Sequence, residues 1–217
     1  MSADGGFLED TRSWLLTRRR GQVIFDAGEP AGLMYRVESG CVRLQINNPD
    51  GERQIVVFLF PGDLFGYEIT DRVCSAEAVS DSTLRCWPVQ AFLKSPQEQP
   101  RVTIQLLEAA QRRFGEMAEH IDKITHLPAK ERVLWFLNGL LTCPGLPREG
   151  GRIHLPMTRL DIADYLGVAP ETLSRILAGL EEDGYLRRDG RRDLELSPEG
   201  FPNARSEASL KLKTAHR

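Results

Sequence analysis

The sequence has no hydrophobic run long enough to cross a membrane. Its longest apolar run in 217 residues, from Ile55 to Phe60, has six residues, whereas a membrane-spanning helix needs about 18 or more. The first twenty residues hold no apolar stretch after a basic start, which excludes a recognisable secretory signal. We therefore expect a cytoplasmic protein without a membrane partner. Charge of one sign is not in large excess either, because the formal net charge is −3, so bulk charge does not indicate a nucleic-acid partner.

Cysteine is scarce and scattered. The four cysteines are Cys41, Cys74, Cys86 and Cys143. None of them belongs to a C-x-x-C pair, and disulfides are rare in cytoplasmic proteins. Reduced and partly buried thiols are therefore the expected state.

Glycine and proline turns divide the segment from residue 21 to about residue 88 into short extended runs. The expected strands are Val23–Phe25, Met34–Val37, Cys41–Ile46, Arg53–Phe60, Ala76–Val79 and Thr83–Trp87. Strands that return about every eight to twelve residues between such turns predict an antiparallel sandwich or jelly roll. Jelly rolls also include metal-dependent oxygenases, which need several histidines and a carboxylate in the barrel. Residues 21–88 contain no histidine, so we expect neither an enzyme nor a metal site.

A long helix is predicted from Arg101 to Leu127, where the sequence has no proline and a single glycine. Apolar residues recur there in alternating steps of three and four, which is the heptad spacing of a coiled coil. The members of this apolar seam are Leu107, Ala110, Phe114, Met117, Ile121 and Ile124. A helix buried against its own domain would need a wider apolar face, so the narrow seam favours a homodimer.

The segment from Met157 to Leu180 predicts a helix-turn-helix. Thr158 and Asp161 are spaced as in the capping box that begins a helix. Gly167 then ends this helix, and Pro170 begins a second one at its favoured first position. The residues expected to face inward are Leu160, Ile162, Ala163, Leu166, Leu173, Ile176, Leu177 and Leu180. Those expected to face outward from the second helix are Glu171, Thr172, Ser174, Arg175 and Ala178.

A hairpin, which we call the wing, is predicted at residues 185–196. Its two strands flank an arginine-rich tip, Asp189-Gly190-Arg191-Arg192. Arginines at such a tip suit the phosphates of DNA, and Arg191 is the candidate contact. A further helix is predicted from Pro128 to Leu141. Two helices followed by a wing at this spacing predict a DNA-binding unit.

These features together resemble the Crp/Fnr superfamily of bacterial transcription regulators. The resemblance extends from Gly21 to Leu196 and includes the long helix and the helix-turn-helix. Its sensory-domain motifs are Gly28-Glu29-Pro30-Ala31, Val37-Glu38-Ser39-Gly40 and Pro61-Gly62-Asp63-Leu64-Phe65-Gly66. Within the family, residues 162–167 and 171–175 are similar to the Fnr and FixK branch, which carries a Glu-x-x-Ser-Arg set on the recognition helix.

The resemblance implies an α+β fold with an N-terminal antiparallel jelly roll, a long dimerisation helix and a C-terminal winged helix-turn-helix. The jelly roll would be of the cyclic-nucleotide-binding type. The expected division is an arm at residues 1–20, the roll at 21–100, the dimerisation helix at 101–127, the winged helix-turn-helix at 128–200 and a flexible tail at 201–217.

The resemblance also implies which residues meet DNA. Glu171, Ser174 and Arg175 share one helical face at spacings i, i+3 and i+4 and are expected to read bases. Arg175 can bond to guanine O6 and N7, Glu171 can accept from a cytosine amino group, and Ser174 can contact a thymine methyl or a base edge. Arg159 and Thr172 match family positions that contact phosphate. The implied DNA site is an inverted repeat of TTGAT-type half-sites, about 34 Å apart.

The signal received by the sensory domain stays open. A cyclic-nucleotide site of the Crp type needs a Gly-Glu pair for the ribose and an Arg-Ser or Arg-Thr pair for the phosphate. Here Glu68 is displaced by one position and Cys74 stands where the arginine is expected, which argues against this ligand. Arg72 nevertheless keeps cyclic-nucleotide binding open as an alternative. The run from residue 68 to residue 78 is instead similar to the FixK branch, whose members need no bound cofactor and are controlled largely by their own synthesis.

Other effectors are open as alternatives. An Fnr-type iron–sulfur cluster needs several cysteines in an N-terminal extension, and residues 1–20 contain none. Haem or nitric oxide sensing would draw on His120, His126, His154 or His216, which all lie outside the roll. Cys74 is the candidate for a redox switch, although no basic neighbour predicts a low pKa. We expect an activator of oxygen-limitation genes that has no cofactor and contacts RNA polymerase through surface loops such as the hairpin from Asn47 to Arg53.

Overall fold

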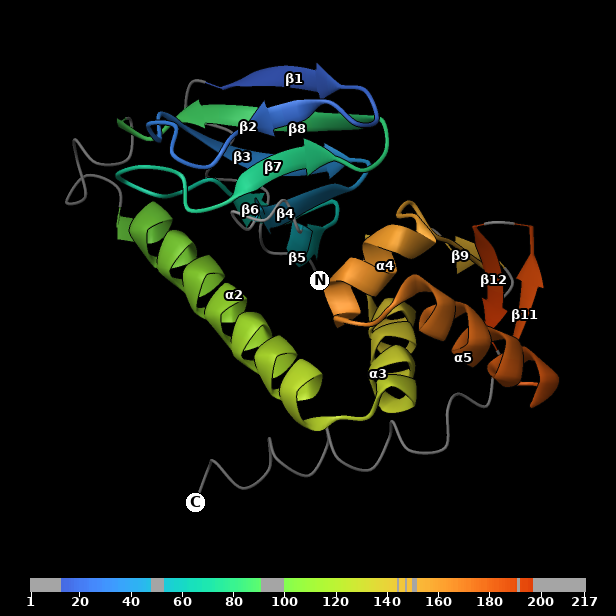
Figure 1. Cartoon of the computed structure of the whole chain (residues 1–217). Coiled ribbons are helices and arrows are strands. Elements are labelled where there is room, and N and C mark those ends of the chain that lie inside the picture. The colour runs from blue at the N-terminus through green and yellow to red at the C-terminus, as the bar shows by residue number, and fades with distance from the viewer. Residues whose placement is uncertain are drawn as a thin grey trace. The chain divides into compact units, whose positions relative to one another are not determined.

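The computed structural model describes residues 13–47, 53–90, 100–143, 145–146, 148–149, 152–190 and 192–196. The chain divides into two compact units, residues 1–121 and 122–217, and the boundary lies inside the long helix α2 (Pro100–His126). Figure 1 traces the elements of each unit along the chain. None of the described helices has both the length and the hydropathy that a membrane span requires.

The first unit is built on two four-stranded antiparallel sheets, which confirms the predicted antiparallel β domain. One sheet has the order β1 (Trp14–Arg18), β8 (Ser82–Pro88), β3 (Leu33–Ser39) and β6 (Leu64–Phe65). The other has the order β2 (Val23–Phe25), β7 (Ser75–Ala78), β4 (Val42–Asn47) and β5 (Arg53–Leu59). Because alternate residues of a strand share a face, each sheet can turn one apolar face to a common core. Core members from the two sheets include Phe25, Tyr35, Val42, Leu59, Phe65 and Leu84.

Strand β1 differs from the sequence analysis, which placed its residues in an N-terminal arm. It pairs with β8 along its full length, from Trp14 opposite Cys86 to Arg18 opposite Ser82. The strand begins with three consecutive apolar residues, Trp14, Leu15 and Leu16, and so lacks the alternation of apolar and polar residues that signals a strand. Trp14 and Leu15 are both exposed. Strand β6 was not predicted either, because two residues are too few to show an alternating pattern.

Helix α2 packs one face against the roll and leaves most of the apolar seam exposed. Leu106 packs against the core cluster around Trp87. Leu107 and Phe114 of the seam are 68% and 76% exposed. Of the other seam residues, Met117 and Ile121 are exposed, and Ala110 and Ile124 are half-buried. The helix is continuous through the whole seam (Figure 1).

The second unit contains the predicted helix-turn-helix and wing. Its helices are α3 (Ala129–Thr142), α4 (Arg159–Leu166) and α5 (Pro170–Glu182). Its antiparallel sheet has the order β11 (Leu186–Asp189), β12 (Asp193–Leu196), β10 (Arg152–His154) and β9 (Arg148–Glu149). Trp135 of α3 stacks on Tyr165 of α4 with ring centroids 6.3 Å apart. Arg132 of α3 donates to the carbonyl oxygens of Leu166 at 3.1 Å and Gly167 at 3.2 Å, so α3 satisfies the end of α4.

Two residues that were predicted to face inward do not. Leu160 is 53% exposed and Ile176 is only half-buried. The buried apolar residues of α4 are Ile162, Ala163 and Leu166. At about 100° per residue these three share one stripe of the helix, and Leu160 lies outside it. The neighbouring Asp161 is buried instead of Leu160, because the Asp161 carboxylate caps the start of the helix.

Candidate nucleic-acid interface

Local hydrogen bonds determine where the two helices of the helix-turn-helix begin and end. Thr158 Oγ1 accepts from the backbone N–H of Asp161 at 3.1 Å, and the Asp161 carboxylate accepts from the backbone N–H of Thr158 at 2.9 Å. This reciprocal pair is the predicted capping box, with Asp in place of Glu. Helix α4 ends at Gly167, whose φ of 60° lies in the left-handed region. Pro170 then stands in the first turn of α5.

Helix α5 has a buried face and an exposed face. The buried residues are Leu173, Leu177 and Leu180. Glu171, Ser174 and Arg175 are all exposed. The structure thus brings together, on one outward face, the three residues that the sequence analysis selected for base reading.

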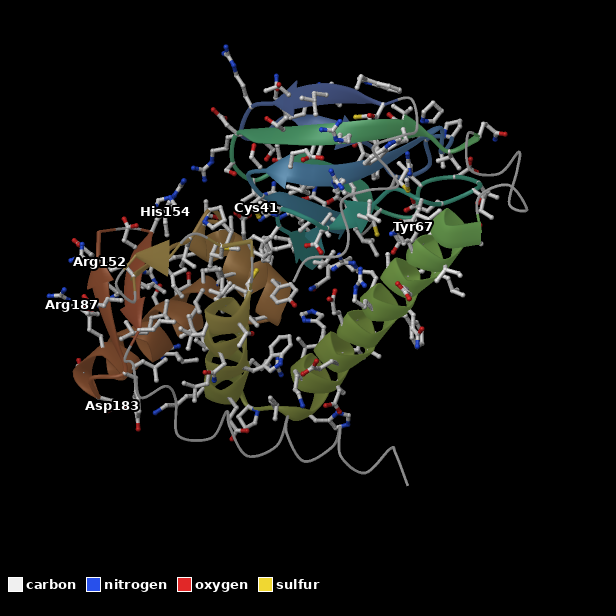
Figure 2. All side chains as sticks on the ribbon, turned by 180° about the vertical axis from the view of Figure 1, so that it is seen from behind. Cys41, Tyr67, Arg152, His154, Asp183 and Arg187 are labelled. Atoms are coloured by element: carbon white, nitrogen blue, oxygen red, sulfur yellow. The ribbon has the colours of Figure 1, made fainter. Side chains whose placement is uncertain are left out.

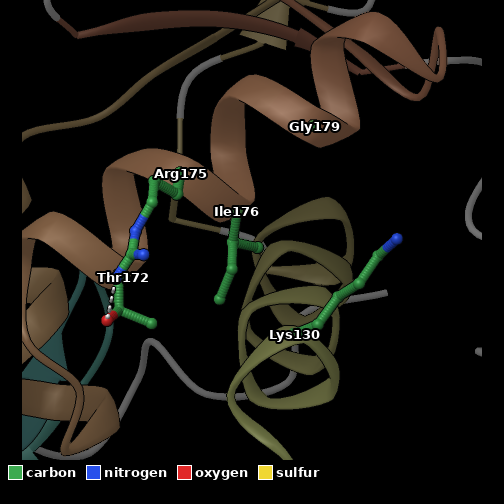
Figure 3. Close-up of a pocket in the computed structure, with 5 residues that line it drawn as sticks. All are labelled: Lys130, Thr172, Arg175, Ile176 and Gly179. Atoms are coloured by element: carbon green, nitrogen blue, oxygen red, sulfur yellow. Dashed lines mark hydrogen bonds between the residues drawn. The ribbon is translucent and has the colours of Figure 1, made fainter.

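The guanidinium of Arg175 lies along the surface of its own helix. Its Nε donates to the carbonyl oxygen of Glu171 and its Nη2 to Thr172 Oγ1, both at 3.4 Å. Figure 3 shows the bond to Thr172. Both distances are at the long end for such bonds, so the side chain can leave them for a better acceptor.

An open hollow of about 430 Å³ lies beside Arg175. Its lining residues are Lys130, Thr172, Arg175, Ile176 and Gly179 (Figure 3). Lys130 comes from the first turn of α3, is 58% exposed along its side chain, and has its Nζ 3.6 Å from Asp183 Oδ2. Two cationic side chains therefore border this hollow, and its lining residues include no carboxylate.

Sequence reasoning missed Lys130, which lies far upstream of the recognition helix. A local signal was nevertheless present. A positive side chain in the first turn of a helix opposes the helix dipole and is unfavourable there. In the structure, Asp183 beside the end of α5 supplies a negative charge close to this lysine.

The residues selected for phosphate contact have different surroundings. Thr172 on α5 and Arg159 at the start of α4 are both half-buried, and Arg191 lies outside the described residues. Burial lowers the pKa of Arg159, and the positive charge of Arg188 lowers it further. Arg159 thus has a second cation in its neighbourhood.

Three arginines of the wing sheet, Arg152, Arg187 and Arg188, are paired with carboxylates of the same unit. Arg187 Nε lies 3.0 Å from Glu195 Oε2, and Arg152 Nη1 lies 3.4 Å from Asp189 Oδ2. Figure 2 shows Arg152 and Arg187 close together on this sheet, and both contact Glu195. A surface of alternating charge attracts a polyanion less than a uniformly basic surface does.

Arg72 is buried in the jelly roll, with its side chain 2% exposed. Its Nη1 lies 2.7 Å from Glu68 Oε2, and its Nη2 donates to the carbonyl oxygen of Leu33. The guanidinium carbon also lies 4.2 Å from the ring centroid of Phe25. An anionic phosphate would have to displace the Glu68 carboxylate to reach this arginine. In this arrangement Arg72 is already paired and does not offer its guanidinium to a cyclic phosphate.

The remaining candidates for effector chemistry are not grouped together. Burial raises the pKa of the Cys74 thiol, and the negative charge of Glu68 raises it further. Burial also raises the pKa of Cys86 to about 11. Within the part of the chain that the structure describes, no three His, Cys, Asp or Glu side chains are placed to hold a metal ion. Of the histidines, His120 is buried, His126 and His154 are exposed, and His216 lies outside the described residues.

Comparisons with known proteins agree with this arrangement. The family model of the cyclic nucleotide-binding domain matches residues 16–98, and that of the Crp-like helix-turn-helix domain matches residues 131–199. The chain is 35% identical over 188 residues to the nitrogen fixation regulation protein FixK of Rhizobium meliloti (strain 1021), a match that covers 85% of this chain and 84% of that protein. It is 27% identical over 177 residues to the anaerobic regulatory protein of Haemophilus influenzae (strain ATCC 51907 / DSM 11121 / KW20 / Rd), covering 80% of this chain and 69% of that protein. The solved structure of FixK2 from Bradyrhizobium japonicum has a TM-score of 0.80 and 32% identity, covering 85% of this chain and 92% of that one.

Proposed function

The chain belongs to the Crp/Fnr family of transcription regulators, and from this premise we propose that it is a homodimer that reads an inverted repeat of TTGAT-type half-sites. The observation that carries the proposal is the outward face of α5, where Glu171, Ser174 and Arg175 are exposed above a row of buried leucines. A helix with such a face suits the major groove, where each base pair presents a distinct pattern of donors and acceptors.

Each of the three side chains has a distinct role in this reading. The fork of Arg175 matches guanine O6 and N7, and only two long hydrogen bonds hold it in the free protein. The Glu171 carboxylate accepts from a cytosine amino group and is repelled elsewhere by the negative DNA, so it adds discrimination rather than affinity. Ser174 is short enough to lie against a thymine methyl or to bond to a base edge.

Phosphate contacts orient the helix in the groove. Arg159, Thr172 and Arg191 keep this role in the proposal, and Lys130 joins them. Support for Lys130 comes from its position at the border of the hollow beside Arg175, where two cations flank Ile176. Such contacts carry no sequence information but fix the register of the protein on the duplex.

The apolar seam of α2 supplies the dimer interface. Leu107 and Phe114 are largely exposed in the single chain, and a second copy that pairs along the same seam would bury them. A two-fold dimer of this kind places two recognition helices about 34 Å apart, which matches one turn of DNA.

The regulator acts in this proposal without a bound cyclic nucleotide or iron–sulfur cluster, as an activator of genes used under oxygen limitation. The engagement of Arg72 by Glu68 supports the absence of a nucleotide. The raised pKa of Cys74 argues against a reactive thiolate there. RNA polymerase is the proposed partner at the hairpin from Asn47 to Arg53, whose residues 48–52 lie outside the described residues.

The test is selection of binding sites in vitro from a random duplex library, with the full-length protein and no added ligand. The expected product is a palindrome with TTGAT-type arms, and a selected site without two-fold symmetry would reject the proposal. The alternative is a family member gated by haem or nitric oxide, a cyclic nucleotide or redox state. A protein that selects its site only after one of these is added would establish that alternative. Mapping of bound genomic sites with and without oxygen limitation then identifies the target genes.

A further inference from the structure

The end of the recognition helix is tied to the wing by one carboxylate. Glu181, in the last turn of α5, accepts from the backbone N–H of Arg188 at 2.9 Å and also from its Nε. The Nη2 of Arg188 contacts the same carboxylate. Arg188 shares its face of β11 with the buried Leu186, whereas Arg187 points to the other, exposed face. Arg188 therefore faces the helices, although 33% of its side chain is exposed.

A second arginine belongs to the same neighbourhood. Arg159 begins α4, and its pKa is lowered by burial and then by the positive charge of Arg188, while Glu181 acts in the opposite direction. The pKa of Glu181 is itself lowered, chiefly by the hydrogen bond from the Arg188 side chain. The hydrogen-bonded pair of Glu181 and Arg188 thus joins α5 to β11, and Arg159 at the start of α4 lies within the electrostatic reach of both.

We propose that Arg159 and Arg188 form a phosphate-binding site whose internal counterion is the carboxylate of Glu181, and that Glu181 thereby limits the affinity of the protein for DNA of any sequence. The inference rests on the proposed function, because the ligand is the phosphodiester backbone beside the recognition helix. It adds Arg188 as a phosphate contact and Glu181 as the residue that weakens this contact.

The physical reason is a difference between the two kinds of DNA contact. Base contacts are made only with the correct sequence, whereas phosphate contacts strengthen binding to every sequence. A guanidinium forms strong paired hydrogen bonds with either a carboxylate or a phosphate. While Glu181 occupies Arg188, a backbone phosphate has to compete with it. Because the contact is available on every sequence, Glu181 lowers the affinity for random DNA and for the correct site alike.

The experiment measures how salt changes the affinity of the full-length protein for two labelled duplexes, a random sequence and the selected palindrome. In Glu181→Gln, Arg188 is free to bind phosphate on random DNA. The plot of log affinity against log salt concentration should become steeper by about 0.9 per protomer. Between about 50 and 200 mM salt this is an extra loss of affinity of about 3.5-fold per protomer. At low salt the affinity for both duplexes should rise, while the ratio between the two affinities changes little.

Two further variants separate this role from other effects of the substitution. Glu182→Gln makes the same change of charge at the same end of α5, on an exposed neighbour, and should leave the salt slope close to that of the unmodified protein. Glu181→Gln combined with Arg188→Gln should return the slope to its original value, because the added contact belongs to Arg188.

Several outcomes would overturn the proposal. They are an unchanged slope in Glu181→Gln, an equal change in Glu182→Gln, and a gain that persists without Arg188. A purely structural role for Glu181 would lower the unfolding temperature and weaken binding to both duplexes at an unchanged slope. If Glu181→Gln does not fold, Glu181→Asp withdraws the carboxylate by one methylene and should steepen the slope in the same direction. Lack of any preference for a palindrome in the unmodified protein would reject the proposed function, while the random duplex would still test this cluster.

Discussion

The Arg72 guanidinium and the Glu68 carboxylate form an ion pair, with Nη1 2.7 Å from Oε2, inside the first unit of the chain. The arginine is almost wholly buried, while the glutamate keeps partial contact with solvent. The two residues are four apart in the sequence, yet the segment between them is not helical. The pair is therefore made by the folded roll, and it places an internal anion at an arginine that could otherwise receive a ligand.

Loss of this internal anion should destabilise the protein. Glu68→Gln leaves a buried guanidinium without its carboxylate, and breaking a buried pair in this way costs about 3–5 kcal/mol. Because Glu68 is partly exposed and Arg72 keeps its bond to the Leu33 carbonyl, we expect about 2–3 kcal/mol in the free energy of unfolding. Chemical denaturation measures the change. Glu29→Gln, an exposed carboxylate of the same unit, is the control, and equal stabilities of the two variants would contradict the expectation.

Removal of Arg175 should relax the choice of base. Arg175→Ala deletes the fork that matches guanine, which should weaken binding to the selected palindrome by about 1–3 kcal/mol per half-site. The preference at one position of each half-site should disappear, while binding to random DNA changes little in comparison. Binding measured on the palindrome and on its three variants at that base pair checks this. A uniform loss across all sequences would instead assign Arg175 to phosphate.

Removal of Lys130 should weaken DNA binding without changing the choice of base. Lys130→Gln should weaken binding to every sequence alike and make the salt slope shallower by about 0.9 per protomer, since one phosphate contact is lost. Lys123→Gln removes the same charge from α2 and serves as the control. An unchanged slope in Lys130→Gln would show that the hollow beside Arg175 does not receive a phosphate.

A charge in the apolar seam should separate the protomers. Phe114 is 76% exposed in the single chain, so Phe114→Glu should leave the fold of the protomer intact. In a paired seam the new carboxylates would face each other in an apolar surrounding, which is strongly unfavourable. Sedimentation should show a monomer that binds the palindrome poorly, while Phe114→Leu keeps the dimer. A dimer that survives Phe114→Glu would place the interface elsewhere.

Cys74 should react slowly with alkylating agents at neutral pH. The thiolate is the reactive form, and burial together with Glu68 raises the pKa of this thiol above its ordinary value. The fraction of thiolate at neutral pH is therefore smaller than in an ordinary cysteine, and the labelling rate should increase as the pH rises toward the raised pKa. Mass spectrometry of iodoacetamide-treated protein measures the rate, with a small thiol as the reference. Labelling as fast as the reference, or loss of DNA binding on mild oxidation that Cys74→Ser prevents, would revive a redox role.

The recognition unit was predictable because its signals are local. Thr158 and Asp161 define one helix start, Gly167 its end and Pro170 the next start, all within a short stretch. Periodicity then assigned the buried leucines of α5 and the exposed Glu171, Ser174 and Arg175, while Thr172, Ile176 and Ala178 proved half-buried. The same reasoning was wrong for Leu160, because a short helix has too few residues to locate its inward stripe.

The contacts between distant residues were not predictable. The pairing of Glu181 with Arg188 depends on how the wing folds back against α5, and Lys130 meets the surroundings of Arg175 only through the packing of α3. Strand β1 carries no alternation, so only its pairing with β8 reveals it. Sequence patterns report which face of an element is apolar, while these features depend on which elements become neighbours.

The hydrogen bonds from Arg132 to the end of α4 determine which segment of this protein can be transferred to another protein. A chimera that contained only α4, α5 and the wing would lack Arg132, the donor to the carbonyl oxygens of Leu166 and Gly167. It would also lack Trp135, which stacks on Tyr165. The smallest transplantable reader of DNA therefore begins at Pro128, ahead of α3, and a graft cut further downstream should lose its shape before it loses its specificity.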